Sequence, residues 1–334
     1  MAVSIAKLSD NFYTAVSLES KPDYSLDHPV LTVSVPGTCG ELIQGWFMKW
    51  QEPVLLSCPI DYFNQIRVRI LKTPDIVVTS AGQYPCQKIR QAAQLALQHF
   101  GCPDLGVCLE VLHQIPVGRG MASSTADIVA VLAGVATALG QEPGSACLAQ
   151  LACQIEPSDS TMFMGATLLA YRGNGRGLEF PSLPPLPLLM LDPEKAVDTQ
   201  HFNNSLNLDA LQRLALSTET ALKLLQRGLL SGDDKAIGMA ATLSALSYQM
   251  IKFNPFIRTA IRWAAETGAI GVIRAHSGSV TGLLYPLETD LGEPIRRLSR
   301  RFKGSITQTR MSPGGHLIFE NTPNVQPLKV RTAR

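Results

Sequence analysis

Residues 116–126 combine a glycine-containing loop with a run of hydroxyl side chains between an expected strand and an expected helix. Apolar and β-branched residues predict the strand over 107–115, and apolar residues at helical spacing follow Ser124. Glycine lets the backbone approach a ligand closely, and the first turn of a helix has N–H groups without internal partners. Such a helix terminus attracts phosphate. The segment therefore predicts a phosphate-binding loop, although a glycine turn before a helix N-cap would use the same residue types.

Two common nucleotide-binding patterns are excluded. The loop lacks the third glycine of the dinucleotide fingerprint, and the chain has no Gly-x-x-x-x-Gly-Lys-Ser/Thr sequence. The residues predicted to bind phosphate are Pro116, Gly118, Arg119, Gly120, Met121, Ala122, Ser123, Ser124 and Thr125.

Two carboxylates, Glu156 and Asp159, follow the loop after about thirty residues, at the end of an expected helix over 146–155. Phosphoryl transfer requires one group that holds Mg²⁺ and another that orients or deprotonates the attacking hydroxyl. A helix ended by Pro157, with Asp159 as a cap, would explain the same residue types.

Two further segments contain turn-forming and small residues. Residues 31–35 are expected to form a strand that is closed by a turn at Pro36 and Gly37, and Thr38 to Gly45 follow it. Residues 271–285 predict a strand, a loop of small residues and a second strand. Further strands are expected over 53–59, 65–71 and 167–171, and further helices over 89–99, 206–228 and 233–254.

These three segments, in this order, resemble the motifs of the GHMP kinases, which phosphorylate small molecules. The phosphate loop carries their Pro-x-Gly-x-Gly-x-x-Ser-Ser pattern, with Met121-Ala122 where the usual form has Leu-Gly. Val280 and Thr281 replace small residues of the third motif. The resemblance implies an α+β fold of two domains, a ribosomal S5 domain 2-like amino-terminal domain and a ferredoxin-like carboxy-terminal domain, with ATP and Mg²⁺ as cofactors.

The resemblance also implies roles for individual residues. Ser124 and Glu156 are expected to hold Mg²⁺, and Asp159 is expected to position or deprotonate the acceptor hydroxyl, so these three are the predicted catalytic residues. The residues expected on the substrate side are Gly37, Thr38, Cys39, Glu41, Arg274, Ser277, Gly278 and Ser279.

Two of these side chains, Arg274 and Glu41, have alternative interpretations. Arg274 suits a substrate carboxylate because guanidinium is a two-pronged donor, but a structural ion pair would use it equally well. Glu41 is interpreted either as a contact for a substrate ammonium or as a turn-stabilising carboxylate. His276 is isolated in the sequence and is expected to be structural, as is Asp61.

The segment from Cys39 to Gly45 resembles a narrower branch, the L-threonine kinases of cobalamin synthesis. That resemblance implies transfer of the γ-phosphoryl of ATP to L-threonine, giving O-phospho-L-threonine. One alternative is homoserine kinase or another small-alcohol kinase of the family, and a second is a nucleotide-binding regulator without catalysis. The presence of both Glu156 and Asp159 argues against the regulator.

The chain of 334 residues is 46% hydrophobic and 17% charged, enough for one large or two moderate cores. Its net charge of +2 is scattered, so neither nucleic acid nor a membrane is an expected partner. Seven cysteines without a Cys-x-x-Cys pair suggest reduced thiols in the cytoplasm. A proline-rich stretch over 181–187 predicts the domain boundary. The expected divisions are an extension over 1–30, an ATP-binding domain over 31–185, a second domain over 186–323 and a tail over 324–334.

Overall fold

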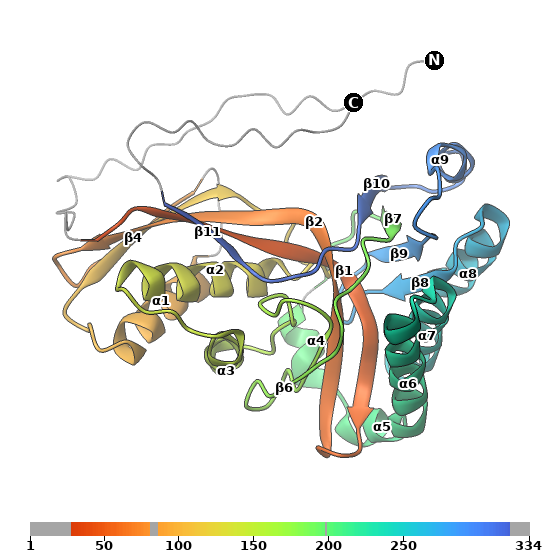
Figure 1. Cartoon of the computed structure of the whole chain (residues 1–334), viewed down its shortest axis with the longest axis horizontal. Coiled ribbons are helices and arrows are strands. Elements are labelled where there is room, and N and C mark those ends of the chain that lie inside the picture. Colours follow the sequence, from red (N-terminus) through yellow and green to blue (C-terminus); the bar gives the residue numbers. More distant parts are fainter. Residues whose placement is uncertain (1–27, 81–85, 198, 321–334) are drawn as a thin grey trace.

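The computed structural model describes residues 28–80, 86–197 and 199–320 (Figure 1). The predicted tail and all but the last residues of the predicted extension lie outside this range. Within it, eleven strands form one sheet in the order β10-β7-β9-β8-β1-β2-β4-β3, with β11 paired to β1, β5 paired to β2, and β6 paired to β5. The strands are β1 (Leu31–Phe47), β2 (Glu52–Leu71), β3 (Ile76–Ser80), β4 (Gly106–His113), β5 (Thr167–Leu169), β6 (Gly177–Glu179), β7 (Pro187–Asp192), β8 (Gly271–Arg274), β9 (Thr281–Leu284), β10 (Ser305–Arg310) and β11 (Leu317–Glu320).

The helices fall into two groups (Figure 1). The first contains α1 (Gln87–His99), α2 (Ser123–Ala138) and α3 (Ser145–Ile155), which lie together on one side of the sheet. The second contains α4 (Thr199–Ser205), α5 (Leu208–Gln212), α6 (Ala215–Ser231), α7 (Asp234–Ser247), α8 (Phe256–Thr267) and α9 (Gly292–Ser299). In this group α6 and α7 lie beside the bent ends of β1 and β2, and α8 and α9 lie farther out, with α8 packed against β8 and β9. No helix in the described ranges has the length and apolar character needed to cross a membrane.

The two long strands β1 and β2 correct the sequence prediction of shorter strands and a turn. β1 continues through Pro36 and Gly37, and β2 spans both of the strands expected over 53–59 and 65–71. The ladder between them shifts register three times between Pro36 and Ile43. A bulged ladder tolerates proline because a donor is unpaired there. Gly37 allows Ile115 and Met121 to pack closely against β1. A Cβ at position 37 would lie 2.9 Å from Ile115 Cδ1 and 3.0 Å from the Met121 carbonyl oxygen.

Buried glycines let the second group of helices approach the sheet closely. A Cβ on Gly238 of α7 would lie 2.3 Å from the Ile270 carbonyl oxygen, and a Cβ on Gly271 of β8 would lie 2.4 Å from Gly238 Cα. The structure also divides two of the expected helices. The one expected over 206–228 becomes α5 and α6, and the one over 233–254 ends at Ser247 and continues as a 3₁₀ turn, Tyr248–Met250.

The main hydrophobic core contains residues from both sides of the predicted domain boundary. Val33 of β1 and Leu132 of α2 belong to the same buried cluster as Leu188 of β7 and Ile273 of β8. A second cluster lies around Trp263 of α8. The boundary at 181–187 stays a prediction.

Candidate active site

The segment between β4 and α2 forms a tight loop whose backbone is fixed from outside. Gly118 and Gly120 have φ values of 73° and 83°, which favour glycine, and Ala122 before α2 also has a left-handed φ of 58°. The Arg119 carbonyl oxygen accepts hydrogen bonds from the backbone N–H groups of Ser279 (2.9 Å) and Val280 (3.0 Å). The loop is therefore held against the turn between β8 and β9 while its own N–H groups at the start of α2 face a cavity.

This cavity has a volume of about 450 Å³ and is lined mainly by the loop and by the segment after α3. It includes most of the predicted phosphate-binding residues, namely Gly118, Gly120, Met121, Ala122, Ser123, Ser124 and Thr125. Pro116 and Arg119 do not line it. The Arg119 guanidinium lies 3.4 Å from an Asp192 carboxylate oxygen, so its side chain braces the loop from behind.

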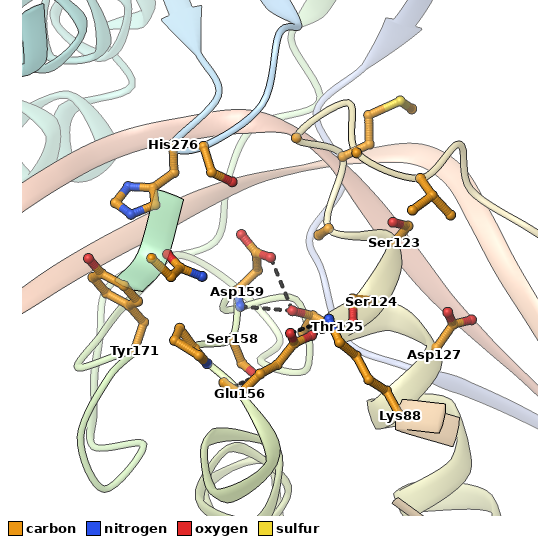
Figure 2. Close-up of a pocket in the computed structure, with 18 of the residues that line it drawn as sticks. Lys88, Ser123, Ser124, Thr125, Asp127, Glu156, Ser158, Asp159, Tyr171 and His276 are labelled. Carbon is orange, nitrogen blue, oxygen red and sulfur yellow. Dashed lines mark hydrogen bonds and ion pairs between the residues drawn. The ribbon is translucent and has the colours of Figure 1, made fainter. Parts of the chain in front are cut away.

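Glu156 caps the carboxyl end of α3 and brings its carboxylate to the first turn of α2. It accepts a hydrogen bond from the Ser124 hydroxyl and forms an ion pair with the Lys88 ammonium (Figure 2). A carboxylate and a hydroxyl suit Mg²⁺, which prefers oxygen ligands and usually keeps waters and substrate phosphates as the remainder. In the described part of the chain no three His, Cys, Asp or Glu side chains gather as a metal site.

Asp159 lies beside Thr125, the residue after Ser124. The Thr125 hydroxyl donates to Asp159 Oδ2, and the Asp159 backbone N–H donates to Thr125 Oγ1, both at 3.1 Å (Figure 2). These two bonds fix the Asp159 carboxyl at the cavity wall, next to the loop that is expected to hold phosphate.

Glu41 of β1 is a second carboxyl close to Asp159, and the two titrate together. Burial, and then the negative charge of Asp159, raise the pKa of Glu41 well above its usual value. Burial also raises the pKa of Asp159. Because two neighbouring buried carboxyls do not both ionise readily, we assign the proton to Glu41 and the charge to Asp159.

Asp127, one turn after Ser124 in α2, also lines the cavity, although no motif or spacing in the sequence singles it out. Its Oδ1 accepts a hydrogen bond of 2.9 Å from the Asn64 amide of β2. Burial raises the pKa of Asp127 to about 8, and the Glu156 charge adds to this effect. Asp127 is therefore mostly protonated at pH 7.

His276 follows β8 and lines the other end of the cavity, where its ring lies among aromatic rings. Its ring centroid is 5.0 Å from that of Tyr171 and 5.4 Å from that of Phe202. Burial lowers the pKa of His276 to about 3, so the imidazole is neutral. The sequence predicted a structural histidine, and the structure adds that it forms part of the cavity wall.

Among the residues predicted for the substrate side, only Glu41 and Ser277 line the cavity. The others lie behind it, where they pack the first and third motifs against the phosphate loop. The Thr38 N–H donates to the Met121 carbonyl oxygen at 3.1 Å, and a Cβ on Gly278 would lie 2.2 Å from Gly120 N. The residues of this supporting group are Gly37, Thr38, Cys39, Gly278 and Ser279.

Arg274 requires a correction. Its side chain is only 2% exposed, and Nη1 donates to Gln249 Oε1 at 3.1 Å and to the Lys252 carbonyl oxygen at 3.0 Å. The guanidinium also lies over the Tyr248 ring. These partners hold it within the protein and away from the cavity, so the structural alternative replaces the predicted contact with a substrate carboxylate.

Sequence reasoning missed several residues of the cavity because they lie outside the three motifs. Lys88 directly precedes the helix expected over 89–99, and Tyr171 ends the strand expected over 167–171, so neither position indicated a functional role. Residues missed in this way are Leu55, Gln87, Lys88, Asp127, Tyr171, Val197 and Asn203.

Comparisons with known proteins show the family to which the chain belongs. The family model for the GHMP kinases N terminal domain matches residues 87–166. An L-threonine kinase of Salmonella typhimurium is 32% identical over 306 residues, covering 89% of this chain and 95% of that protein. An L-threonine kinase of Citrobacter freundii is 32% identical over 254 residues, covering 75% of this chain and 84% of the relative.

Solved structures show the same fold at lower identity. A homoserine kinase from Cytophaga hutchinsonii superposes with a TM-score of 0.67 at 16% identity, covering 93% of this chain and all of that one. The predicted α+β GHMP kinase fold is confirmed. The chain belongs to the GHMP kinase family and is a kinase, similar over most of its length to L-threonine kinases.

Proposed function

We propose that this kinase transfers the γ-phosphoryl of ATP to the hydroxyl of L-threonine and releases O-phospho-L-threonine. The observation that carries the proposal is that the pairs Ser124–Glu156 and Thr125–Asp159 stand side by side at one helix N-terminus within one cavity. The choice of acceptor rests on the similarity to L-threonine kinases.

Each group has a distinct role in the proposed reaction. Backbone N–H groups of the loop from Gly118 to Ser124 hold the phosphates, and Ser124 and Glu156 hold Mg²⁺, which neutralises charge on the phosphates when it is bound. A structure solved in complex with MVAPP, AMPPCP and magnesium has the same fold (TM-score 0.65, 16% identity). Asp159 orients the threonine hydroxyl and accepts its proton, and a raised pKa brings this carboxylate closer to the working pH of a general base.

Alignment and charge stabilisation supply most of the rate in such transfers. The cavity extends from the phosphate loop to Tyr171 and His276. ATP phosphates at the first end and the acceptor molecule at the second can therefore occupy it together. By the resemblance of the segment from Cys39 to Gly45, we assign the product to cobalamin synthesis in the cytoplasm.

The test is phosphoryl transfer from ATP with Mg²⁺ to L-threonine, L-serine, L-homoserine and mevalonate, with each product identified by mass. We expect selective formation of O-phosphothreonine. Transfer to another acceptor would overturn the assignment of threonine as the substrate, while the assignment of kinase activity would stand. Absence of transfer to any acceptor would favour the nucleotide-binding regulator.

Asp159→Asn tests the assignment of the base. We expect kcat to fall by ~10²–10⁴-fold with nucleotide affinity nearly unchanged, because the amide cannot accept the proton. Asp61→Asn is the matched control, since Asp61 is an exposed carboxylate that pairs with Arg310 and does not line the cavity. A near-normal kcat for Asp159→Asn would show that the hydroxyl gives its proton directly to the phosphate.

A further inference from the structure

Three polar atoms in the wall of the cavity lack hydrogen-bond partners. Within the described ranges, Glu41 Oε2, the Tyr171 hydroxyl and Asn203 Oδ1 are buried and bond to no other group. Glu41 and Tyr171 are each only 1% exposed. A buried polar group left unpaired costs about 1–3 kcal/mol, so three of them in one cavity are best explained by a ligand that pairs with them.

These three residues gather at the end of the cavity away from the phosphate loop. The Tyr171 ring packs against His276. Arg172, which follows Tyr171 in the chain, donates a 2.9 Å hydrogen bond to the Asn203 backbone carbonyl oxygen. Figure 2 shows Tyr171 and His276 on the opposite side of Asp159 from Ser124 and Lys88. Glu41 lies beside Asp159, and it is also close enough to Tyr171 for ionisation of Glu41 to raise the pKa of the phenol.

The chemistry of this end favours a ligand with hydrogen-bond donors and a positive charge. The Asn203 amide oxygen can only accept, the Tyr171 phenol oxygen can also accept, and both Glu41 oxygens accept once that carboxyl has lost its proton. Lys88 is the one lysine or arginine among the described residues that line the cavity, and it lies at the phosphate end. His276 is neutral there, and the cations whose charge acts on it, Arg274, Lys252 and Arg172, do not line the cavity.

We propose that Glu41 Oε2, Asn203 Oδ1 and the Tyr171 hydroxyl oxygen form a receptor for the ammonium group of the acceptor. An ammonium has three N–H donors for these three acceptors. The inference rests on the proposed function and extends it, because Tyr171 and Asn203 become residues that select an amino alcohol. Binding of the ammonium favours the ionised form of Glu41, since a positive charge beside a carboxyl lowers its pKa, and the Glu41 proton is released to bulk solvent as the ligand enters.

Recognition of this kind rejects an acceptor that lacks the amine. A site built for a hydrogen-bonding group leaves its own buried atoms unpaired when that group is missing, and such sites discriminate strongly. We expect 3-hydroxybutyrate, which keeps the hydroxyl, methyl and carboxylate of threonine, to bind at least ~100-fold more weakly. L-threoninol, which keeps the ammonium and lacks the carboxylate, should bind more tightly than 3-hydroxybutyrate.

The experiment is calorimetric titration of L-threonine, 3-hydroxybutyrate and L-threoninol into protein saturated with Mg²⁺ and a non-hydrolysable ATP analogue. Wild type is compared with Tyr171→Phe and Asn203→Ala. Tyr171→Phe removes one of the three hydrogen-bond acceptors for the threonine ammonium. We therefore expect threonine affinity to fall by ~10-fold or more, while 3-hydroxybutyrate affinity stays unchanged. Because the Tyr171 hydroxyl has no partner within the described protein, the melting temperature without ligand should be equal or higher.

Tyr285→Phe is the matched control. Tyr285 is also buried, but its hydroxyl is 2.8 Å from Thr267 Oγ1 and lies outside the cavity. We expect this variant to lose some stability and to keep threonine affinity.

The outcomes separate this inference from the proposed function. If wild type phosphorylates threonine, and Tyr171→Phe and Asn203→Ala both bind it within twofold of wild type, the receptor is wrong and the kinase assignment stands. If homoserine is the acceptor and loses affinity in both variants, the receptor stands and the threonine assignment is wrong. Tight binding of 3-hydroxybutyrate, or phosphorylation of mevalonate, which has no amine, would overturn the receptor.

Discussion

At the residue scale, the phosphate end of the cavity depends on one carboxylate with two partners. Glu156 receives both the Ser124 hydroxyl and the Lys88 ammonium. Lys88 is half-exposed on the first turn of α1, so its side chain has freedom to move from Glu156 to a bound phosphate. The same carboxylate can then serve a metal ion, because removing the ammonium frees its oxygens.

Glu156→Gln keeps the shape of this side chain and removes its charge. We expect kcat to fall by roughly 100-fold or more, with a higher Mg²⁺ concentration needed for half-maximal activity, because an amide is a poor Mg²⁺ ligand. Steady-state kinetics over a Mg²⁺ series measures both quantities. Glu110→Gln is the control, since Glu110 is also paired with a cation, Arg67, outside the cavity. Unchanged turnover with unchanged Mg²⁺ dependence would contradict the role of Glu156.

Asp127→Asn should change the pH dependence of stability. A carboxyl whose folded pKa is raised favours folding fully below its unfolded pKa and loses that contribution as pH rises to the folded value, here about 8. The amide does not titrate, so the variant should gain stability relative to wild type between pH 4 and pH 8, by ~1–3 kcal/mol.

Urea unfolding at pH 5 and pH 8 measures this difference. Glu41 and Asp159 also titrate, but they do so in both proteins and so contribute little to the comparison. A stability difference between variant and wild type that is the same at both pH values would show that Asp127 is ionised in the folded protein.

At the element scale, the phosphate loop takes its shape from the turn between β8 and β9. Gly278 in that turn touches Gly120 so closely that a Cβ would lie 2.2 Å from the Gly120 nitrogen and 2.3 Å from the Arg119 carbonyl oxygen. Two backbone hydrogen bonds to the Arg119 carbonyl oxygen join the same segments. The third motif therefore supports the loop from behind, with only Ser277 of its predicted residues at the cavity.

Gly278→Ala should displace the phosphate loop, because backbone atoms cannot move aside as a flexible side chain would. We expect the KM for ATP to rise by ~10-fold or more, since a displacement of 1 Å in a positioning element is costly. ATP titrations and melting curves measure binding and folding separately. In Gly144→Ala, the control, the added Cβ meets no atom within 4 Å and should leave the KM unchanged. Normal ATP binding by Gly278→Ala would show that the loop does not depend on this contact.

At the scale of the whole molecule, one sheet connects the two predicted domains. β1 pairs with β2 on one side and with β8 through Glu41 and Arg274 on the other (Figure 1). The cavity therefore lies where strands from distant parts of the sequence meet. Shared burial of this kind favours unfolding as one unit.

Leu132→Ala and Leu188→Ala test this on the two sides of the predicted boundary. Both side chains are fully buried in the same core, and each truncation should lower the unfolding free energy by ~2–5 kcal/mol. We expect a single calorimetric transition in wild type and a downward shift of that whole transition in each variant. Two transitions, of which each variant moves only one, would instead show that the domains at 31–185 and 186–323 unfold independently.

Local residue patterns predicted the glycine loop before α2, the two carboxylates after α3, and most helices, because each depends on neighbours within a few residues. Glycine before hydroxyl residues, or apolar residues at helical spacing, has a local physical meaning that a single segment expresses. Tertiary packing was needed to place Pro36 within a continuous strand, since that depends on how β2 pairs with it. It also decided that Arg274 is held by Gln249 and Lys252, and that Lys88, Asp127, Tyr171 and Asn203 line the cavity. Those side chains come from elements far apart in the chain, and no local pattern records which of them packing brings together.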